Sequence, residues 1–374
     1  MIATRAVHIG ACLVLLALFA FETFIATPAL RRADRSVFQD VEPLRCQFRW
    51  LVVWSGFAAI GSGVVWFWIV LAKMTGGSLW ELPAIHSTEI AVTRTQFGFL
   101  WDSRLGLMLL FTMAHLIPLG KWRNALFRSH AWQRAGTFVA ATLLAPLAWA
   151  GHAGATLGAQ HLIHLIADAA HLVAAALWPG GLLPLTFFLV RASRSNEPSL
   201  IFAASAITRR FSALSLLVVG VLTATGLVNS YFLVGSFRAL VVSGYGRLLV
   251  LKLSLFLIMI GLGAWNLLRL KPQFTFGSDR NDQQREAIHK LIRNVITELC
   301  LGTLIVLIVG ALGVTPPPRH VMRRALLGSN HLKLGFRQLF YSSQIKWRNF
   351  PTCDQPTQMG KLRRIWLLRP CNQT

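Results

Sequence analysis

Four ionisable side chains recur on one side of the apolar stretch around residues 162–190. They are His161, His164, Asp168 and His171, and the last three follow the first by 3, 7 and 10 residues. These offsets return each side chain to the same face of an α-helix. At 1.5 Å per residue the face descends by about 15 Å. Ionisable groups inside a membrane span are costly and tend to mark function, so this face is the first candidate site.

Two more histidines are predicted to lie at the same side of the membrane. His8 begins the first apolar stretch, with Cys12 one helical turn deeper on the same face, and His152 ends the fourth. Imidazole suits copper, zinc, iron and nickel, whereas thiolate and thioether ligands select Cu(I). The pattern predicts a metal site drawn from His8, His152, His161, His164, Asp168 and His171. The alternative is structural hydrogen bonding between helices, which is the role predicted for His115.

A second set of polar groups is expected about two helical turns below this surface. Asp168, Asn229, Lys252 and Cys12 lie at similar depth when residues are counted from the ends of their apolar stretches. A buried ammonium group needs a partner, so Asp168 and Lys252 are predicted to pair on the ion pathway. The alternative is that Lys252 extends to the surface, which its length allows.

The composition indicates a membrane protein with several spans. Of 374 residues, 54% are hydrophobic and 14% charged, and the mean hydropathy is +0.54, whereas about a quarter of the residues of soluble domains are charged. The net charge of +23 lies in short clusters between apolar runs, so it does not indicate nucleic-acid binding. The lipid bilayer is the expected partner.

Eight apolar runs are long enough to cross a bilayer. They lie near residues 6–27, 50–72, 98–119, 135–151, 162–190, 211–235, 246–268 and 294–314. The predicted fold is an all-α transmembrane bundle with about eight spans. Lys and Arg are concentrated in the odd-numbered connections, which places those connections in the cytoplasm and the N-terminus in the periplasm.

Near the inner side, two features interrupt the apolar pattern. Trp178, Pro179, Gly180, Gly181 and Pro184 predict a kink or break in the fifth helix. Glu22 and Glu298 lie toward the same side and are interpreted as partners of the Arg-rich connections, with continuation of an ion path as the alternative.

The C-terminal segment, residues 319–374, differs from the rest of the chain. It carries eleven Lys or Arg against one Asp, and it has no clear period. We interpret it as an atypical basic tail, disordered or aberrant, that follows a membrane domain of residues 1–318. Truncation after Pro318 is expected to leave membrane insertion unchanged.

Motifs for nucleotide binding and hydrolysis are missing. No G-x-x-x-x-G-K-[ST] sequence occurs, and no arrangement of Ser, His and Asp suggests hydrolysis. The protein is therefore not expected to be an enzyme or an ATP-driven pump.

Several short segments together resemble the bacterial copper resistance D family (CopD). The resemblance covers about residues 1–320 and is most specific within 200–318, in Arg210-Phe211-Ser212, Thr225-Gly226-Leu227-Val228-Asn229, and Tyr245-Gly246-Arg247-Leu248-Leu249 with Lys252. Gly151-His152-Ala153, His164 with Asp168 and His171, and Leu177-Trp178-Pro179-Gly180-Gly181 are also similar to it. Pro179 stands where the family more often has a small or apolar residue.

The resemblance implies eight helices, copper transport across the inner membrane, import as the direction, and a periplasmic copper-binding partner of the CopC type. The functional prediction is a copper permease or channel in which outer histidines collect the ion. Two alternatives are kept. Histidines on neighbouring helices can ligate haem, as in a membrane b-type cytochrome, and a protein that presents copper to a partner need not transport it.

Overall fold

The apolar runs fold as long helices in the computed structural model of the chain. The structure describes residues 1–31, 35–77, 79–80, 85–116, 129–155, 160–195, 197–270 and 281–319. Among these residues every regular element is a helix. The all-α helix bundle predicted from the sequence is confirmed. The predicted basic tail lies, apart from Arg319, outside the described residues.

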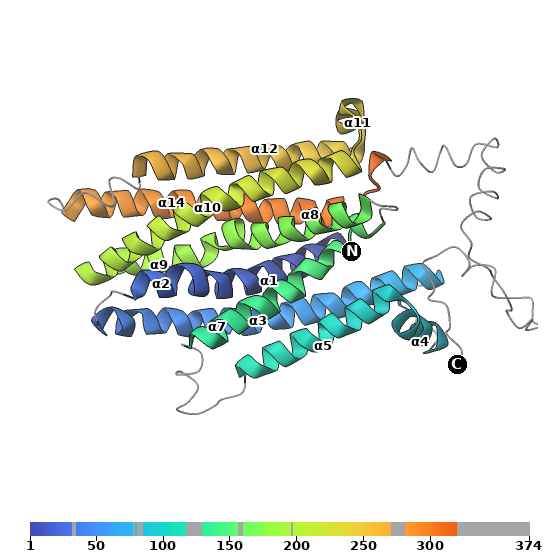
Figure 1. Cartoon of the computed structure of the whole chain (residues 1–374), viewed down its shortest axis with the longest axis horizontal. Coiled ribbons are helices and arrows are strands. Elements are labelled where there is room, and N and C mark those ends of the chain that lie inside the picture. Colours follow the sequence, from blue (N-terminus) through green and yellow to red (C-terminus); the bar gives the residue numbers. More distant parts are fainter. Residues whose placement is uncertain are drawn as a thin grey trace, which may run out of the picture.

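The described residues of the first half of the chain form four long helical rods (Figure 1). The first rod runs from α1 (Ile2–Phe21) through a π-helical turn, η1 (Glu22–Ala26), into α2 (Thr27–Leu30). The others are α3 (Arg35–Thr75), α5 (Gln96–Leu116) preceded by the short α4 (Ile85–Thr93), and α7 (His130–Leu144) extended by the 3-10 turn η2 (Ala145–Ala148).

The part of the second half that the structure describes contributes another four rods. After the short turn η3 (Ala153–Ala155), α8 (Gln160–Ala175) leads through η4 (Ala176–Gly180) into α9 (Leu182–Arg194). The remaining elements are α10 (Pro198–Leu233), the short α11 (Phe237–Val242), α12 (Gly244–Trp265) with η5 (Asn266–Leu270), and α14 (Asn281–Leu312). The predicted interruption of the fifth helix is confirmed, because η4 is π-helical and contains Pro179.

Local sequence sets where several helices begin. Ser129 and Ser243 cap α7 and α12, their hydroxyl oxygens accepting bonds from the backbone N–H groups of Trp132 and Gly246. Pro198 opens α10, where its missing N–H costs nothing. Caps of this kind satisfy backbone groups that a helix end leaves without partners.

Six helices of the described residues are long and apolar enough to cross a membrane. They are Ile2–Leu30, Val41–Thr75, Gln160–Arg194, Ser199–Leu233, Gly244–Leu270 and Glu286–Leu312. The rods of α5 and α7 lie beside them in the bundle (Figure 1), but α5 carries Asp102 and Arg104, and α7 has only 15 residues. Eight spans therefore stay a prediction, while a multi-pass bundle is established.

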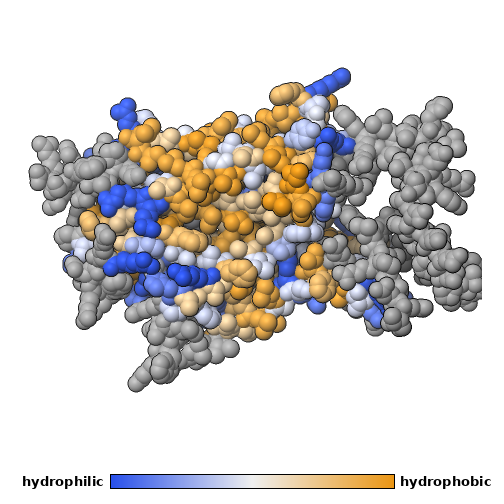
Figure 2. All heavy atoms as spheres, in the orientation of Figure 1, coloured by the Kyte–Doolittle hydropathy of each residue, from blue (hydrophilic) through white to orange (hydrophobic). Residues whose placement is uncertain are grey.

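The first helix occupies the centre of the bundle. Helix α1 packs against α3, α7, α14 and η4, and its side chains dominate the main hydrophobic core. On the face that Figure 2 shows, apolar residues cover the middle of the molecule and hydrophilic residues gather toward its ends. The starts of α1, α8 and α12 share one end with the last residues of α14 (Figure 1). We call this the α1-start end.

Candidate functional site

The predicted face of α8 packs against α10. His164 is 1% exposed, and its ring stacks on the ring of Phe232 with centroids 4.8 Å apart. Three residues further along α8, Ala167 is also buried, so this side of the helix is an interface and not a surface that faces lipid. The polar residues that share the face therefore lie between helices.

Asp168 is held by an amide of the neighbouring helix. Asn229 of α10 donates from Nδ2 to Asp168 Oδ1 at 3.1 Å. The other carboxylate oxygen lies beside Gly151, where an added Cβ would stand 3.6 Å from Oδ2. Asn229 Oδ1 is buried and has no hydrogen-bond partner in the described part of the chain. Asp168 and Asn229 thus present oxygen acceptors that protein donors do not fully use.

The orientation of His171 follows from its contact with Thr225. The Thr225 hydroxyl donates to the carbonyl oxygen of Val221 at 2.6 Å, so its oxygen accepts from His171 Nδ1, 2.9 Å away. His171 Nε2 then carries the lone pair. Lys252 Nζ of α12 lies 3.4 Å from that Nε2 and donates to it. The ammonium group stands where a metal cation would meet the imidazole.

The sequence predicts that Lys252 pairs with Asp168, and the structure places its ammonium group against His171 instead. No ion pair joins Lys252 and Asp168 within 4.0 Å, although each acts electrostatically on the other. Because His171 follows Asp168 by less than one turn, a small movement of the flexible lysine stem changes which group it neutralises. We call Asp168, His171, Thr225, Asn229 and Lys252 the outer polar group.

His161 and His152 lie nearer the α1-start end. His161 Nδ1 is buried and finds no hydrogen-bond partner among the described residues. His152 Nε2 donates to the carbonyl oxygen of Leu312 at 3.1 Å, and its ring meets Tyr245 edge to face. His161 therefore keeps a nitrogen without a partner among the described residues, whereas His152 is engaged with α14 and Tyr245.

His8 occupies a different pocket, between α1, α3 and α5. Its Nδ1 lies 2.9 Å from the carbonyl oxygen of Ala59, and its Nε2 lies 3.2 Å from Arg104 Nη2. The Trp66 and Trp101 rings pack around it, with centroids 5.5 and 5.4 Å away. We call His8, Cys12, Trp66, Trp101 and Arg104 the His8 cage.

Arg104 is fixed firmly in that cage. Its Nε and Nη2 both donate to the carbonyl oxygen of Leu143, at 3.0 and 2.8 Å. Leu143 lies in the last turn of α7, where carbonyl groups lack helical partners. Cys12 is fully buried and interacts electrostatically with the same guanidinium group.

The structure therefore divides the predicted ligand set. Of the described residues, no three His, Cys, Asp or Glu stand together in an arrangement that could hold a metal ion. His8 and Cys12 belong to the His8 cage, whereas Asp168 and His171 belong to the outer polar group. The predicted set included neither Arg104 nor the two tryptophans of the cage. A charged residue within an apolar run was the available signal for Arg104.

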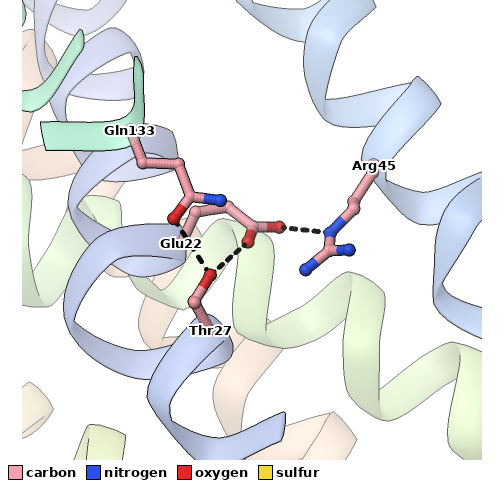
Figure 3. Close-up of polar contacts among 4 residues, drawn as sticks. All are labelled: Glu22, Thr27, Arg45 and Gln133. Carbon is pink, nitrogen blue, oxygen red and sulfur yellow. Dashed lines mark hydrogen bonds and ion pairs between the residues drawn. The ribbon is translucent and has the colours of Figure 1, made fainter. Parts of the chain in front are cut away.

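At the opposite end, Glu22 is part of a network that joins four elements (Figure 3). Arg45 Nε of α3 lies 3.6 Å from Glu22 Oε1. Thr27 donates to Glu22 Oε2 at 3.4 Å and bonds Gln133 of α7 at 3.1 Å. The expected pairing with an Arg-rich connection is confirmed for Glu22. For Glu298 the described residues show a different partner, Asn266, and no arginine of that part of the chain pairs with it.

Two sequence families match the chain over most of its length. Residues 1–162 match the family described as Copper resistance protein D-like, N-terminal domain, and residues 205–312 match Copper resistance protein D. The chain belongs to the copper resistance protein D family. The outer polar group takes His171 and Asp168 from between the two matched segments, and Thr225, Asn229 and Lys252 from the second.

Curated relatives agree with this assignment. The chain is 28% identical over 254 residues to Copper resistance protein D of Pseudomonas syringae pv. tomato, covering 67% of this chain and 78% of the relative. It is 28% identical to Copper transport protein CutJ of Bacillus subtilis (strain 168), covering 63% of this chain and 42% of that protein. Inner membrane protein YebZ of Escherichia coli (strain K12) is 27% identical, with 84% and 98% covered. No solved structure matches the chain significantly.

Family and fold together establish a copper-related protein of the inner membrane with several spans. The family accounts for copper, and the long apolar helices account for the membrane. The described residues add a partly buried polar group between helices α8, α10 and α12.

Proposed function

We propose that the protein carries copper ions through the cytoplasmic membrane toward the cytoplasm, as a permease or channel and not as an enzyme. The observation that carries the proposal is the outer polar group. A carboxylate, an imidazole lone pair and an unused amide oxygen lie between apolar helices of a copper-family protein. Such groups are retained in a membrane only at a cost, so a function that uses them is favoured.

The proposed route begins at the α1-start end. His152, His161 and His164 collect the ion there, and the ion then descends along α8 to Asp168 and His171. His161 supports this step because its Nδ1 is buried without a partner among the described residues. His8 and Cys12 are assigned to the His8 cage, because both nitrogens of His8 are already engaged.

Lys252 acts in this proposal as a tethered cation that copper displaces. Its ammonium group caps the lone pair of His171 while no metal ion is bound. A copper ion that arrives at Asp168 repels the ammonium group and replaces it at Nε2. The positive charge of the site then stays roughly constant through the cycle, which limits the cost of burying an unpaired charge.

The proposed orientation places the N-terminus and the α1-start end in the periplasm. Arg31, Arg45, Arg191, Arg194 and Arg269 gather at the other end, which the positive-inside rule assigns to the cytoplasm. A periplasmic copper-binding protein of the CopC type would then deliver copper beside His152 and His161. Cysteine labelling of a residue placed within 151–155 tests this orientation: reagent that reaches it only from the cytoplasm contradicts it.

The central experiment combines metal analysis with uptake. Purified protein in proteoliposomes should bind copper and admit it into the lumen. The His161→Ala, His164→Ala double variant should lose most of both at unchanged protein level. Bound copper without uptake would instead favour a presenting protein, and a Soret band from bound haem would favour a cytochrome. A His289→Ala variant, altered at an exposed position of α14, is the matched control.

A further inference from the structure

A second carboxyl group lies deep in the bundle, away from the outer polar group. Glu298 of α14 is 2% exposed. It precedes Leu312 by fourteen residues, or about 21 Å of helix, whereas Asp168 follows the start of α8 at Gln160 by eight residues, or about 12 Å. Glu298 thus lies roughly 9 Å further from the α1-start end than Asp168.

The partners of Glu298 are neutral amides. Asn266 of η5 donates from Nδ2 to Glu298 Oε1 at 2.6 Å. Asn294, one turn before Glu298 on α14, donates in turn to Asn266 Oδ1 at 2.8 Å. The amides fix the carboxyl group in place but supply no charge. Unlike the outer polar group, this cluster of one carboxyl group and two amides contains no imidazole, so it is not placed on the histidine route.

No cation faces Glu298 from the described residues packed around it. On η5 and α9, the side chains of Arg269, Arg191 and Arg194 are exposed. On α12, Lys252 lies against His171, and on α1, Arg5 lies over Trp66. The charged groups of α14 itself near its start, Glu286 and Lys290, pair with each other, and Arg293 is exposed. Glu22 is different, because Arg45 stands beside it (Figure 3).

An ionised carboxylate buried without a cation is costly, so a proton is the partner that this environment favours. The location also connects the group to the break in the fifth helix. A Cβ at Gly263 would stand 3.9 Å from Glu298 Oε2 and 3.8 Å from the Trp178 ring, and Pro179 packs 3.4 Å from a Cβ at Gly302. Trp178 and Pro179 belong to η4, which continues directly from the helix that carries Asp168 and His171.

We propose that Glu298 is a proton-binding site that couples copper movement to a proton. Glu298 takes up a proton at its carboxylate and releases it as η4 shifts, so that the ion at Asp168 and the proton at Glu298 act on the same helical rod. The proposal rests on the proposed function for its coupling to copper. The proton site itself depends only on the burial of Glu298 and its amide partners.

Two measurements test the two parts separately. Infrared difference spectra of the purified protein against Glu298→Gln should show the carbonyl stretch of one protonated carboxyl group, shifted in D2O, that the variant lacks.

In proteoliposomes, a pH gradient should change the initial rate of copper uptake several-fold in the unaltered protein. Glu298→Gln should bind copper normally and lose that response. Glu22→Gln, which alters the carboxylate paired with Arg45, should keep it.

The possible outcomes distinguish the proton site, its coupling to copper and the proposed transport function. Absence of the infrared band overturns the proton site, whether or not copper is transported. A gradient response that Glu298→Gln retains, or that the unaltered protein lacks while taking up copper, overturns the coupling. A present band with no copper uptake in any variant keeps the proton site and overturns the proposed transport function.

Discussion

The His8 cage and the outer polar group each place a cationic side chain against a histidine. The two regions differ in how firmly that cation is held. In each, a cationic side chain donates to the Nε2 lone pair of a histidine, Arg104 to His8 and Lys252 to His171. Arg104 is fixed by two further bonds to Leu143. Lys252 makes no other hydrogen bond to the described residues. An arginine is always charged and rigidly forked, whereas a lysine is a single charge on a flexible stem.

This difference separates a structural histidine from one that can receive a metal ion. A histidine whose lone pair accepts from an anchored cation cannot bind a metal ion at that nitrogen. A histidine whose lone pair accepts from a movable cation can bind one when the cation moves away. Unpartnered polar atoms support the same distinction, because Asn229 Oδ1 in the outer polar group and His161 Nδ1 on the same helix face as Asp168 lack hydrogen-bond partners in the described structure. Residue type alone does not separate the two regions.

The largest effect is expected from Arg104→Met in the His8 cage. The change leaves His8 Nε2 and the Leu143 carbonyl without a donor, at roughly 1–3 kcal/mol for each buried group. Removal of the buried charge offsets part of that cost. We expect a large fall in the amount of folded protein in the membrane and a lower midpoint of thermal unfolding. Arg104→Lys should restore neither the amount of folded protein nor the unfolding midpoint, because a single ammonium group cannot replace the hydrogen bonds of the forked guanidinium group to Leu143 and His8. If Arg104→Met is stable but no longer binds copper, the His8 cage belongs to the copper route.

The sequence predicted the helices better than the site. Runs of about twenty apolar residues and the proline of η4, Pro179, are features of local sequence, so the bundle and its interruption were predictable. Helix spacing also placed Asp168 and His171 on one face correctly. The partner of Lys252 was not predictable, because counting depth from helix ends does not give the rotation of α12 about its axis. The separation of His8 from the other histidines depends in the same way on packing with α3 and α5.

The second prediction concerns Asp168→Asn in the outer polar group. The substituted amide keeps an oxygen that can accept from Asn229, so folding should change little. The loss of the negative charge should reduce copper uptake and copper content by about 10–100-fold, the range seen when groups that support a metal site are removed. The matched control is Asp102→Asn, at an exposed position of α5. Equal uptake in both variants would show that Asp168 is not on the route.

The third prediction separates the two cations directly. Lys252→Met removes the tethered cation and leaves the His171 lone pair open, so copper should bind at least as well but leave more slowly. We expect higher copper content in the purified protein together with a few-fold lower uptake rate. Lys252→Arg keeps the charge and should retain copper content close to that of the unaltered protein. Loss of folded protein in Lys252→Met, as expected for Arg104→Met, would remove the distinction between anchored and movable cations.

The smallest effect is expected for His161→Ala, which removes the spare imidazole nearest the α1-start end. His161 Nδ1 has no partner among the described residues, so its loss leaves no donor or acceptor unsatisfied and should not change the unfolding midpoint. If His161 helps to collect copper, uptake should fall a few-fold at low copper concentration and recover when copper is raised, because the deeper groups remain.

His8→Ala is the informative comparison. It should lower stability through loss of the contacts with Ala59 and Arg104 and leave the copper dependence of the surviving protein unchanged. The opposite result, with His8→Ala altering the copper dependence and His161→Ala altering only stability, would place His8 on the copper route and make His161 structural.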